Sequence, residues 1–163
     1  IKDKIKKTIN GKYVLIHLDE KWIDIKNINE NFYDNLNLFQ KKINKKVLLT
    51  SFNNRFDYLI NLKNKLNKNK NNNIILFENS SLDLMERMIY YSSFAISCHS
   101  GFLVQISGTN NSKIIDIINQ RDFIWYSCWV PKNTLHKFVF KSYNKEKVEL
   151  EKILIDVLKA IKN

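Results

Sequence analysis

The sequence has 163 residues, of which 44% are hydrophobic and 12% aromatic, a composition that excludes a wholly disordered chain and permits one domain with a substantial core. No apolar run approaches the roughly 18 residues of a membrane-spanning helix, so we expect none. The 27 basic and 16 acidic residues leave a net charge of +11, which raises the question of an anionic partner.

The basic residues favour a solvated positive surface over a nucleic-acid-binding face. Nearly all are lysines spread among Asn and Ile, a bias typical of an AT-rich genome, and the arginines are Arg55, Arg87 and Arg121. Proteins that read bases more often use Arg for bidentate contacts, and no RNP, KH or zinc-finger pattern occurs. We therefore do not expect nucleic acid as a partner, whereas attraction to an anionic ligand or lipid surface stays open.

The secondary-structure elements are predicted in chain order after residues 1–11, which resemble a linker or the end of an upstream element. Residues 12–163 form the predicted domain. Short apolar runs predict strands over 13–18, 47–52, 73–77, 94–97, 113–118 and 135–140. Apolar spacing of three and four predicts helices over 29–43, 55–66, 101–107 and 144–161.

One more helix is predicted to open at Ser80, which forms an S-x-x-D capping box with Asp83, and to bury Leu82, Met85 and Ile89. Two loops are predicted from composition: the Asn- and Lys-rich stretch 63–73 and the aromatic stretch 120–131.

The alternation of strands and helices predicts an α/β fold. We expect a Rossmann-like, doubly wound parallel sheet of about five or six strands with helices on both faces. The strands are continuous apolar runs, as expected when both faces of a sheet are buried. In such sheets ligands bind outside the carboxyl ends of the strands, which selects four candidate segments, 19–22, 51–54, 78–81 and 99–102.

The strongest signal for a ligand is the turn at Ser100-Gly101. Gly101 lets a ligand approach the backbone, and the amides of Gly101 and Phe102 would point outward from a helix N-terminus, which suits a phosphate. The alternative is a strand-to-helix turn that merely needs a glycine. His99 either contacts a diphosphate or a ribose, or it satisfies a backbone carbonyl at the strand end, and the sequence leaves both open.

The other strand ends add four candidate contacts. Lys21 follows the first strand and could reach a phosphate oxygen as a point charge. Ser51 and Asn53 follow the second strand and could hold a ribose or a base. Glu78 follows the third strand and could hydrogen-bond the same groups. An ordinary charged loop and plain strand-to-helix turns would give the same residues.

The remaining histidines and the cysteines are predicted to be structural. We expect His17 to be a core or edge histidine of the first strand, and His136 to lie outside any group of site residues. We expect Cys98 and Cys128 to be buried thiols in a reducing compartment. No metal-ligand cluster appears, and the aromatic cluster of 125–131 is more typical of a packed lid or an interface than of a cofactor site. The sequence lacks GxGxxG after the first strand, GxxxxGK[ST] and GxSxG, which argues against NAD-binding, P-loop and common hydrolase sites.

Three motifs over residues 13–118 resemble the C-terminal half of GT-B glycosyltransferases, most closely family 9 of the heptosyltransferase type. His17-Leu18 and Lys21-Trp22 resemble that family's first strand and its Lys-containing phosphate loop. Residues 79–89 are similar to its SLxELAxLI helix, and residues 94–109 to its FVVSxDSGxxHLAAALGTP segment. His99 stands where the family has Asp, Val104 or Gln105 where it has His, and Asn110 where it has Pro.

The resemblance implies a donor-binding domain for a nucleoside-diphosphate sugar, with a glycan or lipid-linked acceptor. It also implies an N-terminal acceptor domain that supplies the catalytic base, no bound metal or other cofactor, and a cytoplasmic location with peripheral contact at the inner face of the membrane. No catalytic residue is assigned in this chain. Two alternatives remain, a nucleotide-binding or scaffold domain without turnover and a basic RNA-associated domain.

Overall fold

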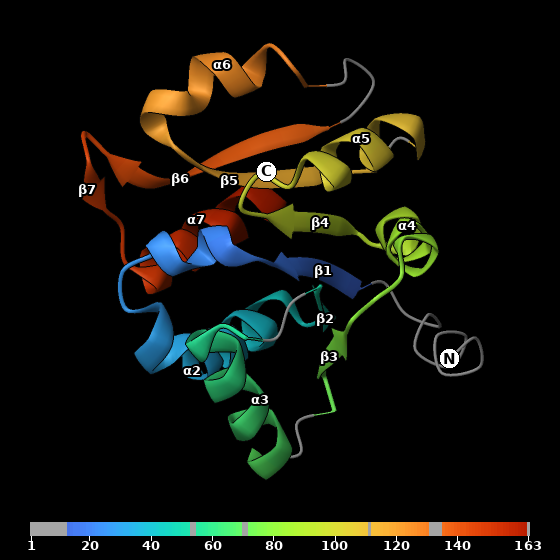
Figure 1. Ribbon diagram of the computed structural model, residues 1–163, viewed down its shortest axis with the longest axis vertical. Helices are drawn as coiled ribbons and strands as arrows, with labels where there is room; N and C mark the ends of the chain where they lie inside the picture. The colour runs from blue at the N-terminus through green and yellow to red at the C-terminus, as the bar shows by residue number, and fades with distance from the viewer. Residues whose placement is uncertain (1–12, 53–54, 70–71, 111, 131–134, 163) are drawn as a thin grey trace.

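The computed structural model describes residues 13–52, 55–69, 72–110, 112–130 and 135–162, which form one sheet of seven strands in the order β3-β2-β1-β4-β5-β6-β7 (Figure 1). Neighbouring strands from β3 to β6 pair in parallel, and only β7 pairs antiparallel, with β6. This confirms the predicted α/β, Rossmann-like parallel sheet. The strands are β1 (Tyr13–Leu18), β2 (Lys46–Ser51), β3 (Ile74–Glu78), β4 (Phe94–Ser97), β5 (Ile114–Asn119), β6 (His136–Tyr143) and β7 (Glu146–Lys147).

The central strands form because their side chains are apolar on both faces. All six residues of β1 and all four of β4 are buried, and each face of the sheet has its own hydrophobic core. Parallel strands covered on both sides are expected to have this composition. The six predicted strands are therefore all present: β1 and β4 have the predicted ends, the ends of the other four are shifted by one to three residues, and the two-residue β7 was not predicted.

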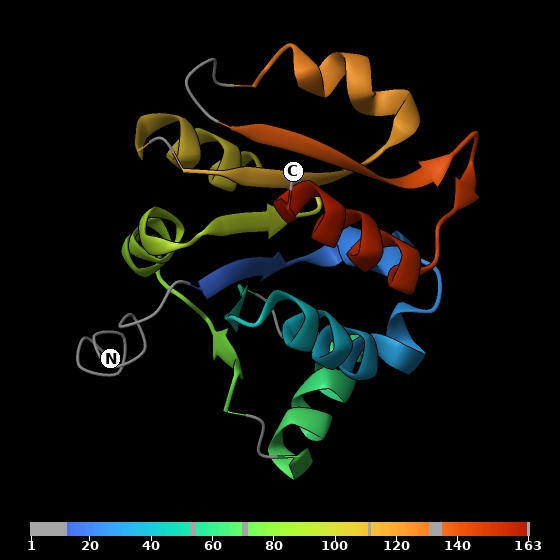
Figure 2. The same cartoon turned by 180° about the vertical axis from the view of Figure 1, so that it is seen from behind.

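Two layers of helices cover the sheet. Helices α2, α3 and α7 pack on one face, with α2 and α7 side by side in Figure 2, and α4 and α5 pack on the other. The helices are η1 (Glu20–Asp24), α2 (Ile28–Ile43), α3 (Asp57–Asn69), α4 (Leu82–Tyr91), α5 (Gly101–Asn110), η2 (Gln120–Asp122), α6 (Phe123–Ser127) and α7 (Leu150–Lys162). Among the described residues, no helix is long and apolar enough to cross a membrane.

Helix ends account for most of the corrections to the predicted elements. The N-cap of α4 is Ser81, whose hydroxyl accepts a hydrogen bond from the Leu84 amide at 3.3 Å, so the predicted cap at Ser80 is wrong by one residue. Ser80 instead donates to the Phe77 carbonyl. Leu82, predicted to be buried, is 60% exposed at the start of the helix.

Two predicted loops are partly helical. Helix α3 continues to Asn69 through much of the stretch that was predicted as a loop, and the aromatic stretch forms η2 and α6. Helix α6 lies along β6 (Figure 1), with the Phe123 ring against those of Phe138 and Phe140. Cys98 is buried as predicted, but Cys128, at the end of α6, is exposed, because only one side of this short helix faces the sheet. The predicted linker at 1–11 lies outside the described residues.

Candidate functional site

The site lies where the strand order reverses. From β1 the chain continues toward β2 on one side, and from β4 it continues toward β5 on the other, while β1 and β4 are neighbours. Such a switch point is where doubly wound sheets bind ligands. The segments that follow the two strands meet there, because Lys21 Nζ donates a hydrogen bond of 2.7 Å to the His99 carbonyl oxygen.

The loop after β1 is fixed from several sides. Asp19 caps η1 by accepting from the Lys21 amide at 3.1 Å, and the Tyr58 hydroxyl donates to the Asp19 carbonyl at 2.7 Å. Lys141, a buried lysine of β6, donates to the Lys21 carbonyl at 2.7 Å. Trp22 is fully buried and donates from Nε1 to a carbonyl of β1. The backbone that presents the Lys21 ammonium is therefore rigidly held.

The Asp19 carboxyl group in this loop has an altered pKa. Burial raises the pKa of Asp19 to about 6, and the opposing effect of the Lys21 ammonium and amide is smaller. Carboxyl groups with a pKa shifted in this way are common at functional sites. By contrast, burial lowers the pKa of His17 to about 4, which keeps this core histidine neutral, as its predicted structural role requires.

His99 adopts a strained backbone conformation at the end of β4. Its φ of 52° lies in the left-handed region, which costs a residue with a side chain on the order of 1–2 kcal/mol. Three contacts hold it there: the hydrogen bond from Lys21, a 2.6 Å contact from Nδ1 to Asp116 Oδ2, and ring stacking on Tyr126 with centroids 3.5 Å apart. Strain that the surroundings enforce in this way is typical of functional residues.

Helix α5 begins directly after this residue. The Ser100 amide donates to Ser97 Oγ at 3.1 Å, and the Ser100 carbonyl accepts from the Val104 amide. The first helical amides, those of Gly101 and Phe102, have no acceptor within the helix. These amides, together with the helix dipole, suit an anion.

Neither the backbone conformation nor the packing at position 101 requires a glycine. Gly101 does not have a positive φ, and a Cβ at this position would meet no heavy atom within 4 Å. The space above the first turn of α5 is therefore open, as a ligand that approaches these amides would need. Phe102, by contrast, is half-buried and packs on the core beneath α5.

The remaining predicted contacts lie away from this centre. Ser51 ends β2 and is fully buried, which leaves no surface for a ligand. Glu78 ends β3, two strands from β1, and forms an ion pair with Lys63 at 2.9 Å. Asn53 lies outside the described residues. The structure thus brings together Lys21 and the segment 99–102, whereas Ser51 and Glu78 lie in other environments.

Two cavities of the described residues lie away from the turn at Gly101. A cavity of about 390 Å³ lies between α3 and β3 and is lined by Lys63 and Glu78, among others. A second cavity, of about 210 Å³, is lined by Asp24, Arg121 and Lys145 and lies beside η1. Neither of these two cavities is lined by residues of the turn at Gly101. Among the described residues, no group of His, Cys, Asp and Glu side chains is arranged to hold a metal ion.

Sequence reasoning missed three residues that surround His99. Asp116 lies in the middle of β5 and is fully buried, and His136 at the start of β6 places Nε2 3.4 Å from Asp116 Oδ2. Tyr126 reaches the His99 ring from α6. His136 therefore belongs to the group of side chains around Asp116 and His99, contrary to the prediction. The signal for Asp116 was present in the sequence, since one acid interrupts the apolar run IIDII.

Neither a protein-family model nor a curated protein matches this sequence. Several solved structures share its fold, among them MnaA and ALG13. Staphylococcus aureus MnaA, determined with UDP, superposes with a TM-score of 0.68 at 10% identity over 99% of this chain and 39% of that chain. The solution structure of ALG13 superposes with a TM-score of 0.55 at 12% identity over 93% of this chain and 86% of that chain.

This chain spans 39% of the length of the MnaA chain, so the comparison with MnaA covers only part of that protein. At such low identities the likeness shows the fold alone, a GT-B-like, Rossmann-like α/β fold. The narrower resemblance to glycosyltransferase family 9 stays a prediction.

Proposed function

We propose that this chain is the donor-binding half of a GT-B glycosyltransferase and binds a nucleoside-diphosphate sugar for glycosyl transfer to a glycan or lipid-linked acceptor. The observation that best supports the proposal is the convergence of Lys21 and the first turn of α5 on His99 at the switch point of the sheet. That MnaA shares this fold and has been determined with UDP also supports a nucleotide ligand.

In the proposed complex the diphosphate lies against the amides of Gly101 and Phe102, with the Lys21 ammonium and the His99 ring beside it. Negative charge grows on the diphosphate as the sugar bond breaks, and preformed donors at that place stabilise it. The resemblance to GT-B enzymes implies that no resident metal is needed for this. It also implies that the catalytic base comes from an N-terminal acceptor domain, so the chain's proposed role is donor binding.

The cellular setting follows from the same proposal. A lipid-linked acceptor implies a cytoplasmic protein in peripheral contact with the inner face of a membrane. The net charge of +11 and the exposed side chains of Ile124 and Trp125 on α6 and of Trp129 just after it are typical of surfaces that contact anionic lipid headgroups.

Thermal melting with UDP, GDP and ADP tests the proposal. A ligand at about 100 times its Kd stabilises the native state by about 2.7 kcal/mol, which raises the Tm of a domain of this size by roughly 5–10 °C. We expect at least one diphosphate to give such a shift and the matching monophosphate to give a smaller one. No shift with any of the three would contradict the proposal, and steeply salt-dependent RNA binding in its place would favour the RNA-associated alternative.

A further inference from the structure

A buried carboxylate lies directly beneath the candidate site. Asp116 has no exposed surface, and both neighbouring imidazoles approach its Oδ2: His99 Nδ1 at 2.6 Å and His136 Nε2 at 3.4 Å. Burial alone would raise the pKa of Asp116, but the imidazoles of His136 and His99 outweigh it and hold this pKa below its ordinary value. The carboxylate is therefore ionised near neutral pH.

An ionised carboxylate without solvent needs a positive partner. The cationic side chains nearest the site bond elsewhere, since Lys21 donates to the His99 carbonyl and Lys141 to the Lys21 carbonyl. The imidazoles are the groups that contact the carboxylate itself. Of the two, His99 makes the short hydrogen bond, and because an ionised carboxylate only accepts, the shared proton belongs to Nδ1.

The position of the His99 ring leaves one polar edge for a ligand. Its Nδ1 edge faces Asp116, one of its faces stacks on Tyr126, and the side chain as a whole is 20% exposed. The remaining polar atom is Nε2. With the proton on Nδ1 fixed by Asp116, an additional proton on Nε2 converts this edge from an acceptor into a cationic donor.

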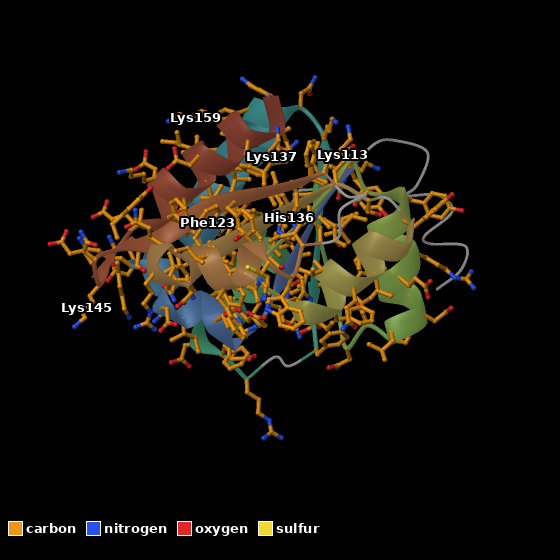
Figure 3. All side chains as sticks on the ribbon, turned by 90° about the horizontal axis from the view of Figure 1, so that it is seen from above. Lys113, Phe123, His136, Lys137, Lys145 and Lys159 are labelled. Atoms are coloured by element: carbon orange, nitrogen blue, oxygen red, sulfur yellow. The ribbon has the colours of Figure 1, made fainter. Side chains whose placement is uncertain are left out.

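His136 belongs to the same buried polar cluster as Asp116 and His99, in which several polar atoms lack a hydrogen-bond partner. Its side chain is 2% exposed and its ring stacks on Phe138, and Figure 3 shows it near the middle of the face seen from above. The 3.4 Å approach of His136 Nε2 to Asp116 Oδ2 is an electrostatic contact and not a hydrogen bond, so among the described residues Asp116 Oδ1 and both ring nitrogens of His136 are buried without a hydrogen-bond partner. Buried polar groups rarely stay unpaired without a functional reason, and two imidazoles on one carboxylate oxygen are an expensive arrangement for a merely structural role.

We propose that Asp116 is a positioning residue that holds His99 as an imidazolium, with Nδ1 turned inward and Nε2–H presented to a diphosphate at the first amides of α5. The inference rests on the proposed function, because it assigns the anion to the same site. The groups that face His99 are Lys21 from η1, Asp116 from β5, His136 from β6, Tyr126 from α6, and Arg121 and Asp122 behind Tyr126. Of these, Asp116 makes the only ionic contact with the ring among the described residues.

The test uses protein labelled with ¹⁵N at its three histidines, inorganic pyrophosphate as the probe, and the Asp116→Asn variant. The asparagine amide oxygen still accepts from Nδ1, so the variant removes the charge and keeps the shape. In the wild type near about pH 7 we expect imidazolium shifts for His99 that move when pyrophosphate is added. In Asp116→Asn we expect a neutral His99, about tenfold weaker pyrophosphate binding, and recovery of binding on acidification. His17, which stays neutral, is the internal reference.

Three results would overturn the inference: a neutral His99 in the wild type, wild-type His99 signals that do not respond to pyrophosphate, or equal pyrophosphate affinity and pH profile in wild type and Asp116→Asn. The first two are read from the wild type and do not depend on how the variant folds. A failed function proposal looks different: pyrophosphate moves the His99 signals, while UDP, GDP and ADP bind no better than pyrophosphate.

Discussion

Gly101→Asp is expected to abolish nucleotide binding while leaving the free protein at least as stable as the wild type. The new side chain enters open space, and a carboxylate in the first turn of a helix stabilises the helix through its interaction with the helix dipole. The same carboxylate would repel a diphosphate on these amides by about 4 kcal/mol at about 4 Å and an effective dielectric of about 20. Binding should weaken by at least about a hundredfold, as measured by calorimetric titration with the diphosphate that gives the largest Tm shift.

Gly101→Asn is the matched control, because it has the size of Asp without the charge. We expect it to bind more weakly than the wild type, since a side chain now occupies the approach to the amides, but more tightly than Gly101→Asp. Lys21→Ala should also lose the nucleotide-dependent rise in Tm, because it removes the ammonium on the other side of the site. Undiminished binding in Gly101→Asp would show that the nucleotide lies elsewhere.

The second large effect is on stability and is expected from Trp22→Ala. Trp22 is fully buried in η1, contacts the Phe32 ring at 5.7 Å between centroids, and donates to the His17 carbonyl at 2.9 Å. Removal of a buried Trp side chain costs about 3–5 kcal/mol, a large share of the roughly 5–15 kcal/mol that stabilises a typical domain. Urea denaturation should show this loss as a lower midpoint.

Trp22→Phe separates packing from the hydrogen bond. It keeps an aromatic ring in the core and loses the N–H donor, so the free energy of unfolding should fall by about 1–3 kcal/mol from the lost donor and the smaller ring. Nucleotide binding should persist in this variant, because Asp19, Tyr58 and Lys141 still hold the Lys21 backbone. A loss below about 1 kcal/mol in Trp22→Ala would contradict the assigned role of Trp22 in the core.

The sheet could be predicted from the sequence because its strands are buried on both faces. Runs such as YVLIHL and FAIS are almost entirely apolar, and they form β1 and β4. Helix α6 has no such signal, since its aromatic residues are mostly exposed and only Phe123 and Tyr126 pack inward. The short β7 depends on its pairing with β6, which local composition does not encode.

That Lys21 and His99 lie together at the candidate site was predictable for a similar reason, whereas the residues that surround His99 were not. The rule that ligands bind at strand ends selected Lys21 and His99 without any contact information. Asp116 and His136 come together only through the parallel register of β5 and β6, which pairs Ile114 with His136. Contacts across a sheet between residues 20 apart leave no periodic trace in the sequence. The same rule also selected Glu78, because it does not distinguish strands near the switch point from those two positions away.

The most direct test of the account is an amide NMR titration of ¹⁵N-labelled protein with the nucleoside diphosphate that most raises the Tm. The account predicts that the amide signals of Gly101 and Phe102 shift most, with smaller shifts in the η1 loop around Lys21. Signals around Glu78 and Lys63 should stay in place. Shifts confined to the cavity between α3 and β3, with Gly101 and Phe102 unmoved, would contradict the claim that the start of α5 binds the diphosphate.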